Sequence, residues 1–384
     1  MRRTILFAAA ASLAAACGES TTSPYPLTSA SDHRSANRTG DATQGAVFTE
    51  TNAIAGNAVV AFARATDGSL TYAGTFSTGG RGIGGTSDPL ASQFSLVLGG
   101  DDNRLLFVAN AGSNDVSTFR VDGANLSLVG TTSTGGTLPV SLAVAHRTLY
   151  VLNAASNSVS GFDIGNDGTL SAKSEASSPL GAGANGGAAV RVSPDGNWLV
   201  VTEKGSNTID VFPVSGTGAL GSPVRSGSSG LAPFGFDFVN GDQLVVSEAG
   251  SGASSLYDIA AGGRLNTESA SVSTNGGVAT CWLIATTDGR FAFAVNAGSG
   301  TISGYRIGVR GMTLLDASGV SANTGLGSNP LDLDLSSGDR YLYVLENGTG
   351  RIGAFAVGAD GALSPLAGIG GLPANSGLQG IAAY

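Results

Sequence analysis

The chain is poor in the side chains on which many enzymes depend, because its 384 residues include only two Cys and two His. With His33 and His146 as the whole supply, an ordinary His-based zinc site and a Ser-His-Asp triad are excluded. We therefore expect no metal and no cofactor. Cys281 lies in the apolar stretch CWLIA, which predicts a buried core residue rather than a reactive thiol.

Charged residues are also scarce, at 12% of the chain. The 19 Lys and Arg are outnumbered by 28 Asp and Glu, which gives a formal net charge of −9 and a pI near 4.6. The basic residues form no patch in the sequence, which argues against nucleic acid and an anionic membrane surface as partners. Apolar residues show no sustained spacing of three and four, so helices are not expected.

The N-terminus has the pattern of an export signal. Arg2 and Arg3 precede the apolar run Ile5–Ala16, which has the length of a signal-peptide core and is too short to span a bilayer as a helix. Cys17 follows Leu13-Ala14-Ala15-Ala16, which resembles the bacterial lipobox, where such a Cys is diacylated. The Leu lies four residues before the Cys rather than three, so ordinary cleavage after the Ala run is the alternative. We expect an exported protein whose only attachment to a membrane is a lipid anchor at Cys17.

The composition divides the chain into three parts. Residues 18–45 are rich in Ser, Thr, Asn and Pro and have almost no large apolar side chains, which predicts a flexible tether. The tether follows a signal peptide with a lipobox-like end (residues 1–17) and precedes a folded domain (residues 46–384). Gly18 rather than Asp follows the Cys, which in a Gram-negative host favours an outer-membrane lipoprotein; a periplasmic protein is the other expectation.

Glycine is abundant, with 60 residues, and one sequence pattern recurs seven times. Its clearest copies are LLFVANAGSNDVSTF (Leu105–Phe119), LYVLNAASNSVSGF (Leu149–Phe162) and FAFAVNAGSGTISGY (Phe291–Tyr305). The first apolar run of each copy ends at Ala53, Asn110, Asn153, Glu203, Glu248, Asn296 and Glu346. The steps after Asn110 are 43, 50, 45, 48 and 50 residues, the length of a four-stranded propeller blade. The sequence therefore predicts an all-β, seven-bladed β-propeller in a single domain.

The turn residues order the strands within a blade. In the fourth blade we expect an inner strand at Gly187–Ser193, then strands at Trp198–Thr202, Thr208–Val214 and Ala219–Arg225. Asp-Gly pairs recur between such runs, at Asp67-Gly68, Asp167-Gly168, Asp195-Gly196, Asp288-Gly289 and Asp360-Gly361. A calcium loop would need several carboxylates at alternating positions, whereas these turns offer one or two, so tight hairpins are favoured.

The two ends of the folded domain complement each other. The first blade starts at its second strand (Ala46–Glu50) and lacks an inner strand upstream. The last residues, Leu378–Tyr384 (LQGIAAY), read as an inner strand with no blade of its own. We expect the C-terminal strand to pair with the N-terminal blade and close the ring, so that no long sheet edge is left free.

One face of such a ring gathers the polar candidates. The loops after the second strands and the loops that enter the inner strands emerge together on what we call the long-loop face; the Asp-Gly turns mark the opposite, turn face. Long loops and convergent polar groups around a channel are the usual site on this scaffold. The candidate binding residues there are Arg81, Asn110, Asn153, Lys204, Asn296 and Glu346, and the candidate catalytic residues are Glu203 and Glu248. The alternative is structural: an Asn or Glu ending each second strand hydrogen-bonds the backbone of a loop.

The repeat resembles that of the lactonase-like β-propeller family, which includes bacterial 6-phosphogluconolactonases. The resemblance rests on YVLN (Tyr150–Asn153), SPDG (Ser193–Gly196) and YVLENGTGRIGAF (Tyr343–Phe355) and covers Ala46 to Tyr384. It implies the fold and, for hydrolytic members, a His in an inner strand, a Pro-Arg-His element and a Glu after the Asn. The matching positions here are Ala188, Thr280-Cys281-Trp282 and Ala297. The family's hydrolytic pattern is therefore absent at three places.

Two functions follow as expectations. The favoured one is a monomeric, exported binding or scaffold module that holds an envelope protein, a glycan or a small metabolite without turning it over. The alternative is a lactone hydrolase that uses Glu203 and Glu248, with Lys204 or Arg81 polarising the carbonyl. An enzyme should bring these four residues together in a deep pocket, whereas a scaffold should show a broad face with exposed aromatic residues such as Phe234.

Overall fold

A computed structural model describes residues 45–100, 103–309 and 311–384. The signal peptide, Cys17, His33 and the tether lie outside the described residues. Within these ranges, no helix is long and apolar enough to cross a bilayer.

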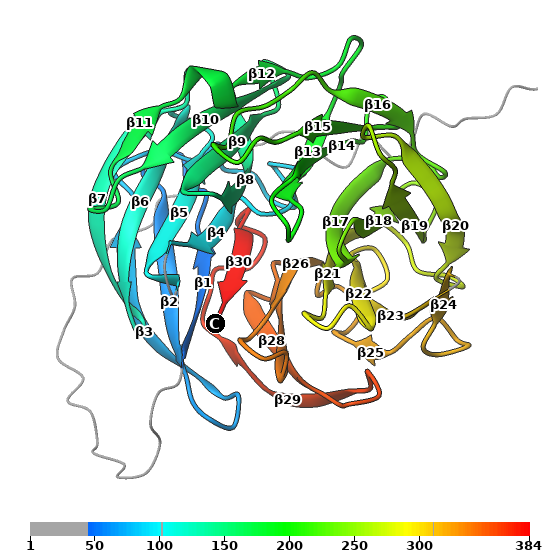
Figure 1. Cartoon of the computed structure of the whole chain (residues 1–384). Coiled ribbons are helices and arrows are strands. Elements are labelled where there is room, and N and C mark those ends of the chain that lie inside the picture. Colours follow the sequence, from blue (N-terminus) through cyan, green and yellow to red (C-terminus); the bar gives the residue numbers. More distant parts are fainter. Residues whose placement is uncertain (1–44, 101–102, 310) are drawn as a thin grey trace, which may run out of the picture.

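The described strands form seven antiparallel sheets arranged as blades around a central channel (Figure 1). Blade 1 contains β30 (Gln379–Ala383), β1 (Gly45–Glu50), β2 (Ala58–Arg64) and β3 (Leu70–Ser77). Blade 2 contains β4 (Leu96–Gly99), β5 (Leu105–Asn110), β6 (Asp115–Asp122) and β7 (Asn125–Ser133). Blade 3 contains β8 (Pro139–Ala145), β9 (Thr148–Asn153), β10 (Ser158–Ile164), β11 (Leu170–Ala172) and β12 (Ser178–Pro179), with a 3-10 turn at Ser174–Ala176. Blade 4 contains β13 (Gly187–Val192), β14 (Trp198–Glu203), β15 (Thr208–Pro213) and β16 (Val224–Gly227).

The remaining three blades repeat this order from the channel outward. Blade 5 contains β17 (Pro233–Asn240), β18 (Gln243–Glu248), β19 (Ala253–Ile259) and β20 (Leu265–Ser273). Blade 6 contains β21 (Thr280–Ala285), β22 (Phe291–Asn296), β23 (Thr301–Gly308), β24 (Gly311–Leu314) and β25 (Ala322–Asn323). Blade 7 contains β26 (Pro330–Leu335), β27 (Tyr341–Glu346), β28 (Arg351–Val357) and β29 (Leu363–Gly370). The predicted all-β, seven-bladed propeller is confirmed.

The position of a strand within its blade decides its pattern of burial. The second strands β5, β9, β22 and β27 are buried at every residue, because both of their faces pack on neighbouring blades. The apolar clusters accordingly cross blade boundaries: Phe48 of blade 1 packs with Leu106 and Phe119 of blade 2. Outer strands such as β3 are largely exposed. Burial between blades, rather than within any one sheet, therefore holds the ring together.

The C-terminal strand closes the ring, as expected. β30 pairs antiparallel with β1, in the register Val47↔Ala383, and Figure 1 shows the last strand (red) beside the first (blue). Thr49 Oγ1 donates to the Gly380 carbonyl oxygen (2.7 Å), and Arg64 Nε donates to the Tyr384 carbonyl oxygen (3.0 Å). Blade 1 thus combines the two ends of the folded chain in one sheet.

The Asp-Gly pairs form tight turns, each with its Gly at positive φ, between 66° and 88°. In the turn of blade 4, Asp195 Oδ1 accepts from the Asn197 N–H (3.0 Å), so the carboxylate serves the turn itself.

One strand prediction was wrong: the outer strand of blade 4 begins at Val224 instead of Ala219, because Gly221 and Pro223 interrupt the expected strand. The predicted second strand of blade 1, Ala46–Glu50, is confirmed with one more residue at its start, since β1 is Gly45–Glu50. The repeat position of blade 1 is therefore Glu50 rather than Ala53, and the loop that follows is longer than its counterpart in blade 2.

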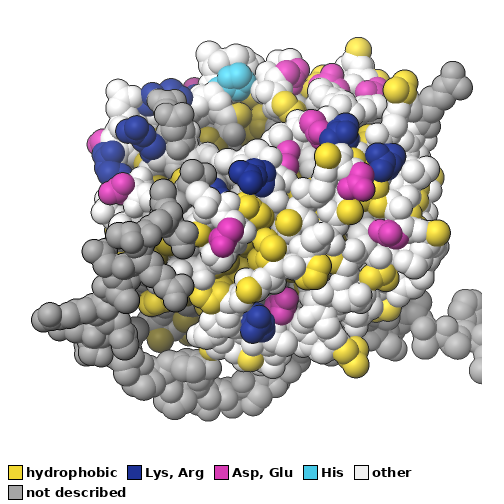
Figure 2. Space-filling view, turned by 90° about the horizontal axis from the view of Figure 1, so that it is seen from below, with side chains coloured by type: hydrophobic (Ala, Val, Ile, Leu, Met, Phe, Trp, Pro, Cys, Tyr) yellow, Lys and Arg dark blue, Asp and Glu magenta, His cyan; other side chains and the backbone are white. Residues whose placement is uncertain are grey.

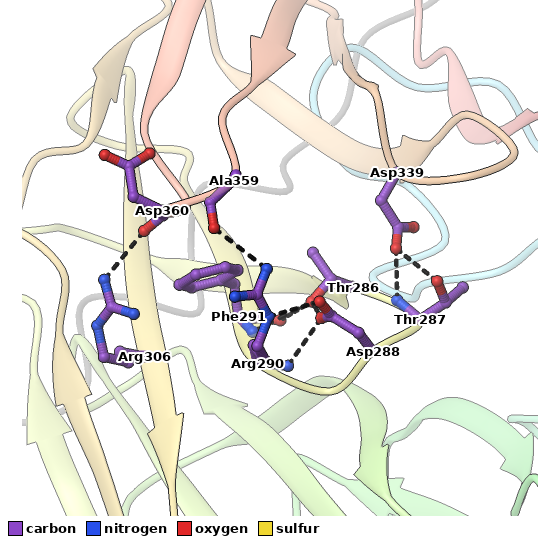
Figure 3. A network of polar contacts seen from close by, with 9 residues as sticks. All are labelled: Thr286, Thr287, Asp288, Arg290, Phe291, Arg306, Asp339, Ala359 and Asp360. Atoms are coloured by element: carbon purple, nitrogen blue, oxygen red, sulfur yellow. Dashed lines mark hydrogen bonds and ion pairs between the residues drawn. The ribbon is translucent and has the colours of Figure 1, made fainter.

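Charges on the turn face tie neighbouring blades together. Arg290 and Arg306 lie on either side of the Phe291 ring (Figure 3). The guanidinium carbon of each is 5.0 Å from the centre of that ring. Arg290 donates to the Ala359 carbonyl oxygen of blade 7 (3.1 Å), and Thr287 N donates to Asp339 Oδ2 (2.8 Å). On the side seen in Figure 2, basic and acidic side chains are interspersed.

Candidate functional site

The central channel is crossed by residues Ser92–Phe94, which precede β4 and which we call the plug. Gln93 Nε2 donates to the Leu283 carbonyl oxygen of blade 6 (2.9 Å) and to Asp332 Oδ1 of blade 7 (3.2 Å). Leu283 N donates back to Gln93 Oε1 (3.1 Å), and Gln93 N donates to the Ala188 carbonyl oxygen of blade 4 (3.0 Å). One glutamine of blade 2 therefore bonds to three blades across the channel.

The plug is fixed at further points. Ser92 Oγ donates to the Val140 carbonyl oxygen of blade 3 (2.8 Å), and Trp282 Nε1 donates to the Ser92 carbonyl oxygen (2.8 Å). On the long-loop side, Lys204 Nζ donates to the carbonyl oxygen of Ala91, the residue before the plug (2.8 Å). The plug therefore separates the long-loop half of the channel from the turn-face half.

The turn-face half contains a cavity of about 210 Å³. Inner strands of five blades, Phe94 of the plug and one turn residue form its walls. Each inner strand has one edge without a strand partner, which faces the channel. The lining residues are Phe94, Leu96, Val97, Leu98, Asn103, Leu142, Ala143, Val144, Arg191, Val192, Asp334, Ile381, Ala382 and Ala383. Apolar side chains thus surround two charged groups, Arg191 and Asp334.

Arg191 is held on two sides. Its Nε lies 3.2 Å from Oδ1 of the buried Asp237 of β17, and its guanidinium carbon lies 4.5 Å from the centre of the Phe94 ring. Burial raises the pKa of Asp237, while Arg191 and the Ala285 N–H lower it. The ion pair and the ring fix the guanidinium in place, which preorganises it for a ligand.

Asp334 lies across the cavity on β26 and is partly exposed. Its Oδ2 accepts from the Ala383 N–H (2.8 Å), and its Oδ1 accepts from the Leu335 N–H (2.9 Å). Burial raises the pKa of Asp334 to about 7, against these two backbone donors and Arg191, while the nearby Asp237 adds to the increase. A carboxyl that titrates near neutral pH is suited to general acid–base chemistry.

The predicted asparagines of the long-loop face are buried, and each bonds to the third strand of its own blade; Asn110 Oδ1 also accepts from Asn57 Nδ2 of blade 1 (3.0 Å). Nδ2 of each donates to the Ser seven residues later on the third strand: Asn110 to Ser117 (2.7 Å), Asn153 to Ser160 (2.9 Å) and Asn296 to Ser303 (2.9 Å). The same geometry recurs in three blades, so it belongs to the repeat.

The predicted carboxylates have comparable partners. Glu203 accepts from Ser206 Oγ (2.7 Å) and pairs with Arg225, while burial and Asp210 raise its pKa to about 7. Glu248 is fully buried in the next blade and accepts from the Gly230 N–H (2.9 Å) and from Ser255 Oγ. Glu346 accepts from Thr349 Oγ1 (2.9 Å). No contact between Glu203 and Glu248 is found among the described residues.

Other predictions also have outcomes. Arg81 is exposed in the β3–β4 connection, where its N–H donates to Ser113 Oγ (2.8 Å). Phe234 is 3% exposed and packs on Trp282, with ring centres 5.1 Å apart, so it does not supply the exposed aromatic residue that a scaffold face should show. Cys281 is a buried free thiol whose pKa is raised by burial, as expected. In the described ranges, no three His, Cys, Asp or Glu side chains gather to hold a metal.

The sequence analysis missed Arg191, Asp237 and Asp334, although a signal for them exists. Each interrupts an apolar inner strand, in GAAVRV, PFGFDFVN and PLDLDL. A charged residue within a buried strand needs a partner or a solvated opening, and inner strands line the channel. This signal pointed to the channel wall rather than to the loop ends.

Comparisons with known proteins agree with the fold. A family model described as "Lactonase, 7-bladed beta-propeller" matches residues 54–178 and 142–282. A 6-phosphogluconolactonase of Yersinia pestis is 23% identical over 272 residues, which cover 68% of this chain and 79% of that protein.

Two solved structures are similar in fold. The periplasmic gluconolactonase of Pseudomonas aeruginosa has a TM-score of 0.64 at 19% identity and covers 86% of this chain and 99% of its own. A protein from Lactobacillus plantarum has a TM-score of 0.70 at 18% identity and covers 88% of this chain and 98% of its own. Together with the family match, which spans more than half of the sequence, they confirm the resemblance noted from the repeat: the chain belongs to the family of lactonase seven-bladed β-propellers.

Proposed function

We propose that this protein hydrolyses a lactone in the turn-face cavity. The observation that carries the proposal is that Arg191 and Asp334, whose pKa is raised to about 7, line the same cavity. Membership of the lactonase family supports it. The proposal replaces histidine by a carboxyl, since the family's histidine positions are occupied by small or apolar residues.

In the proposed reaction, ionised Asp334 removes a proton from a water molecule as the water oxygen bonds to the lactone carbonyl carbon. The carbonyl oxygen gains negative charge, and the guanidinium of Arg191 stabilises it. The ring C–O bond then breaks, and the proton on Asp334 passes to the departing ring oxygen. The product is the open hydroxy acid, and Asp334 returns to its ionised form.

The first test is proton release during lactone hydrolysis by the purified protein, measured above the uncatalysed rate. Asp334→Asn should lower kcat by about a hundredfold or more, because a general base contributes that much. Glu203→Gln and Glu248→Gln are the matched controls and should retain turnover, since each serves its own blade. Loss of turnover in these two variants but not in Asp334→Asn would transfer the role to the long-loop face.

The pH profile gives a second prediction. Because the proposed base must be ionised and its pKa is raised to about 7, kcat/KM should rise about tenfold per pH unit below pH 7 and level off above it. The measurement is the initial rate from pH 5 to 8, corrected for spontaneous hydrolysis. A profile that is flat across pH 7 would contradict the assignment of Asp334 as the base.

A binding role is the second candidate, and one observation favours it. Four large aliphatic side chains in loops of the long-loop face are exposed: Ile54 (65%), Leu231 (59%), Val278 (51%) and Leu326 (95%). Exposed aliphatic residues are enriched where a protein partner docks. A photo-crosslinker at Leu326 should then capture an envelope protein in cells, whereas one at Leu128 on the outer strand β7 should not. Equal labelling at both positions would reject this role.

We also propose that the protein is exported to the periplasm and anchored by a lipid at Cys17. Support comes from the N-terminal sequence pattern and from the periplasmic gluconolactonase among the similar structures. Cys17→Ser should move the protein from the detergent phase to the aqueous phase in a phase-separation experiment. Recovery of the unsubstituted protein in the aqueous phase would instead indicate ordinary cleavage after the Ala run.

A further inference from the structure

The charges in the turn-face cavity limit the substrates that it can accept. Arg191 is the one Lys or Arg among the described residues that line the cavity, and its Nε is already paired with Asp237 at 3.2 Å. Asp334 adds a second carboxyl. A phosphate group would therefore meet one guanidinium whose charge is already offset by Asp237 behind it, and one carboxyl, Asp334, whose ionised form repels the phosphate.

The cavity wall has a donor pattern that also disfavours phosphate. Proteins bind phosphate with clustered Arg or Lys side chains or with the N–H groups at a helix N-terminus. The described wall consists of strand edges, which alternate N–H donors and C=O acceptors. Sugar hydroxyl groups both donate and accept and so match such an edge, whereas a phosphate dianion only accepts.

The size of the cavity points the same way. Its volume of about 210 Å³ is below the roughly 300–1,000 Å³ of sites that hold drug-sized ligands. The plug closes its inner end, with the ring of Phe94 packed against Arg191. A small ring compound fits these limits better than one extended by a phosphate.

From these observations we infer that the substrate is an uncharged lactone of about one sugar ring and that the phosphorylated form is excluded. The inference rests on the proposed hydrolysis and specifies its substrate. It departs from the 6-phosphogluconolactonase relatives, whose name specifies a phosphorylated sugar lactone.

The test compares glucono-δ-lactone with its 6-phosphate as probes, by proton release with the purified protein. We expect kcat/KM to favour the uncharged lactone by at least about tenfold. Equal or better turnover of the phosphate would overturn the inference and leave the proposed hydrolysis intact. Absence of turnover with both probes would instead reject the hydrolysis and the inference with it.

A charge variant makes the test specific to the cavity. Asp237→Asn removes the carboxylate that neutralises Arg191, so the preference for the uncharged probe should narrow several-fold. Asp242→Asn is the matched control, because it removes one negative charge from the β17–β18 turn of the same blade, outside the cavity lining. An equal change in both variants would show that overall charge, rather than the cavity, sets the preference. Thermal unfolding of both variants checks that each is folded.

Discussion

Gly196 is a residue at which the backbone conformation disfavours any side chain and at which the exposed side chain of His146 would have to move to admit one. Its φ is +77°, and a Cβ atom there would lie 1.9 Å from Nε2 of His146 in the adjacent blade. Gly338, in the corresponding turn of blade 7, has the same φ of +77° but nothing within 4 Å of its Cβ position. The two glycines therefore separate backbone strain from steric contact.

Gly196→Ala should accordingly destabilise the protein more than Gly338→Ala does. Both variants incur the cost of positive φ for alanine, about 1–2 kcal/mol. Only the first must also displace the His146 imidazole, and because that ring is exposed and can rotate, the added cost lies at the low end of the about 1–3 kcal/mol of overpacking. Urea unfolding of both variants measures the difference. Adding His146→Ala to Gly196→Ala should recover most of the extra loss in the free energy of unfolding. If Gly196→Ala and Gly338→Ala lower that free energy equally, the turns can move apart.

At the same scale, the sequence predicted some residues well and others badly. Cys281 and the Asp-Gly turns followed from local chemistry, because an apolar run or a turn specifies its own residues. The environment of Phe234 did not, since its burial depends on Trp282 of the next blade. Arg191 and Asp334 were missed because they are far apart in the sequence and only ring closure brings them to one cavity.

Among the elements, the C-terminal strand β30 joins blade 1 to the blades on both of its sides. It pairs with β1, and Asp334 Oδ2 of blade 7 accepts from the Ala383 N–H. Tyr384, the residue after the strand, donates its hydroxyl to the Gly123 carbonyl oxygen of blade 2 (2.9 Å). The C-terminal segment thus joins three blades.

Deletion of Leu378–Tyr384 should therefore destabilise the whole ring rather than fray one end. It would leave β1 as an exposed edge and remove one wall of the cavity. We expect a lower unfolding midpoint and a broader transition in urea, followed by fluorescence and circular dichroism. Removal of Tyr384 alone is the control and should preserve cooperativity. Unchanged cooperative unfolding of the longer deletion would refute the role of β30 in closure.

The order of the strands was predictable because the same sequence pattern recurs seven times. Features that depart from this pattern were not predictable. The plug is one such departure. Gln93 lies shortly before β4, the inner strand of blade 2, yet its hydrogen bonds go to blades 4, 6 and 7. Nothing adjacent to Gln93 in the sequence marks these distant partners.

For the whole molecule, the buried carboxyls predict how stability varies with pH. Burial raises the pKa of Glu50 and of Asp332 from their ordinary values of 4.5 and 3.8 to about 8. At a pH between the ordinary pKa of the unfolded chain and the raised pKa of the folded protein, these two carboxyls keep protons in the folded state that they release on unfolding. The free energy of unfolding therefore falls as the pH rises. The stabilising contribution of these two carboxyls to the folded state is complete below about pH 4 and is lost above about pH 8.

We therefore expect lower stability at pH 8.5 than at pH 5.5, measured by urea unfolding at constant ionic strength. Asp332→Asn removes one of the titrating groups and should reduce the slope between these pH values. Asp67 and Asp167 have lowered pKa values, so their contribution is lost only on acidification through their folded pKa values, below the ordinary 3.8 and outside this window. Constant stability from pH 5.5 to 8.5 would show that the buried carboxyls do not hold their protons.

The plug also has a kinetic consequence for the proposed reaction. Because Ser92–Phe94 close the channel at one end, we expect substrate to reach the described cavity from the turn face. Product must leave by the path along which substrate arrives, so the two cannot pass through the ring in sequence. Accumulated hydroxy acid should then act as a competitive inhibitor, and progress curves should slow before substrate is exhausted.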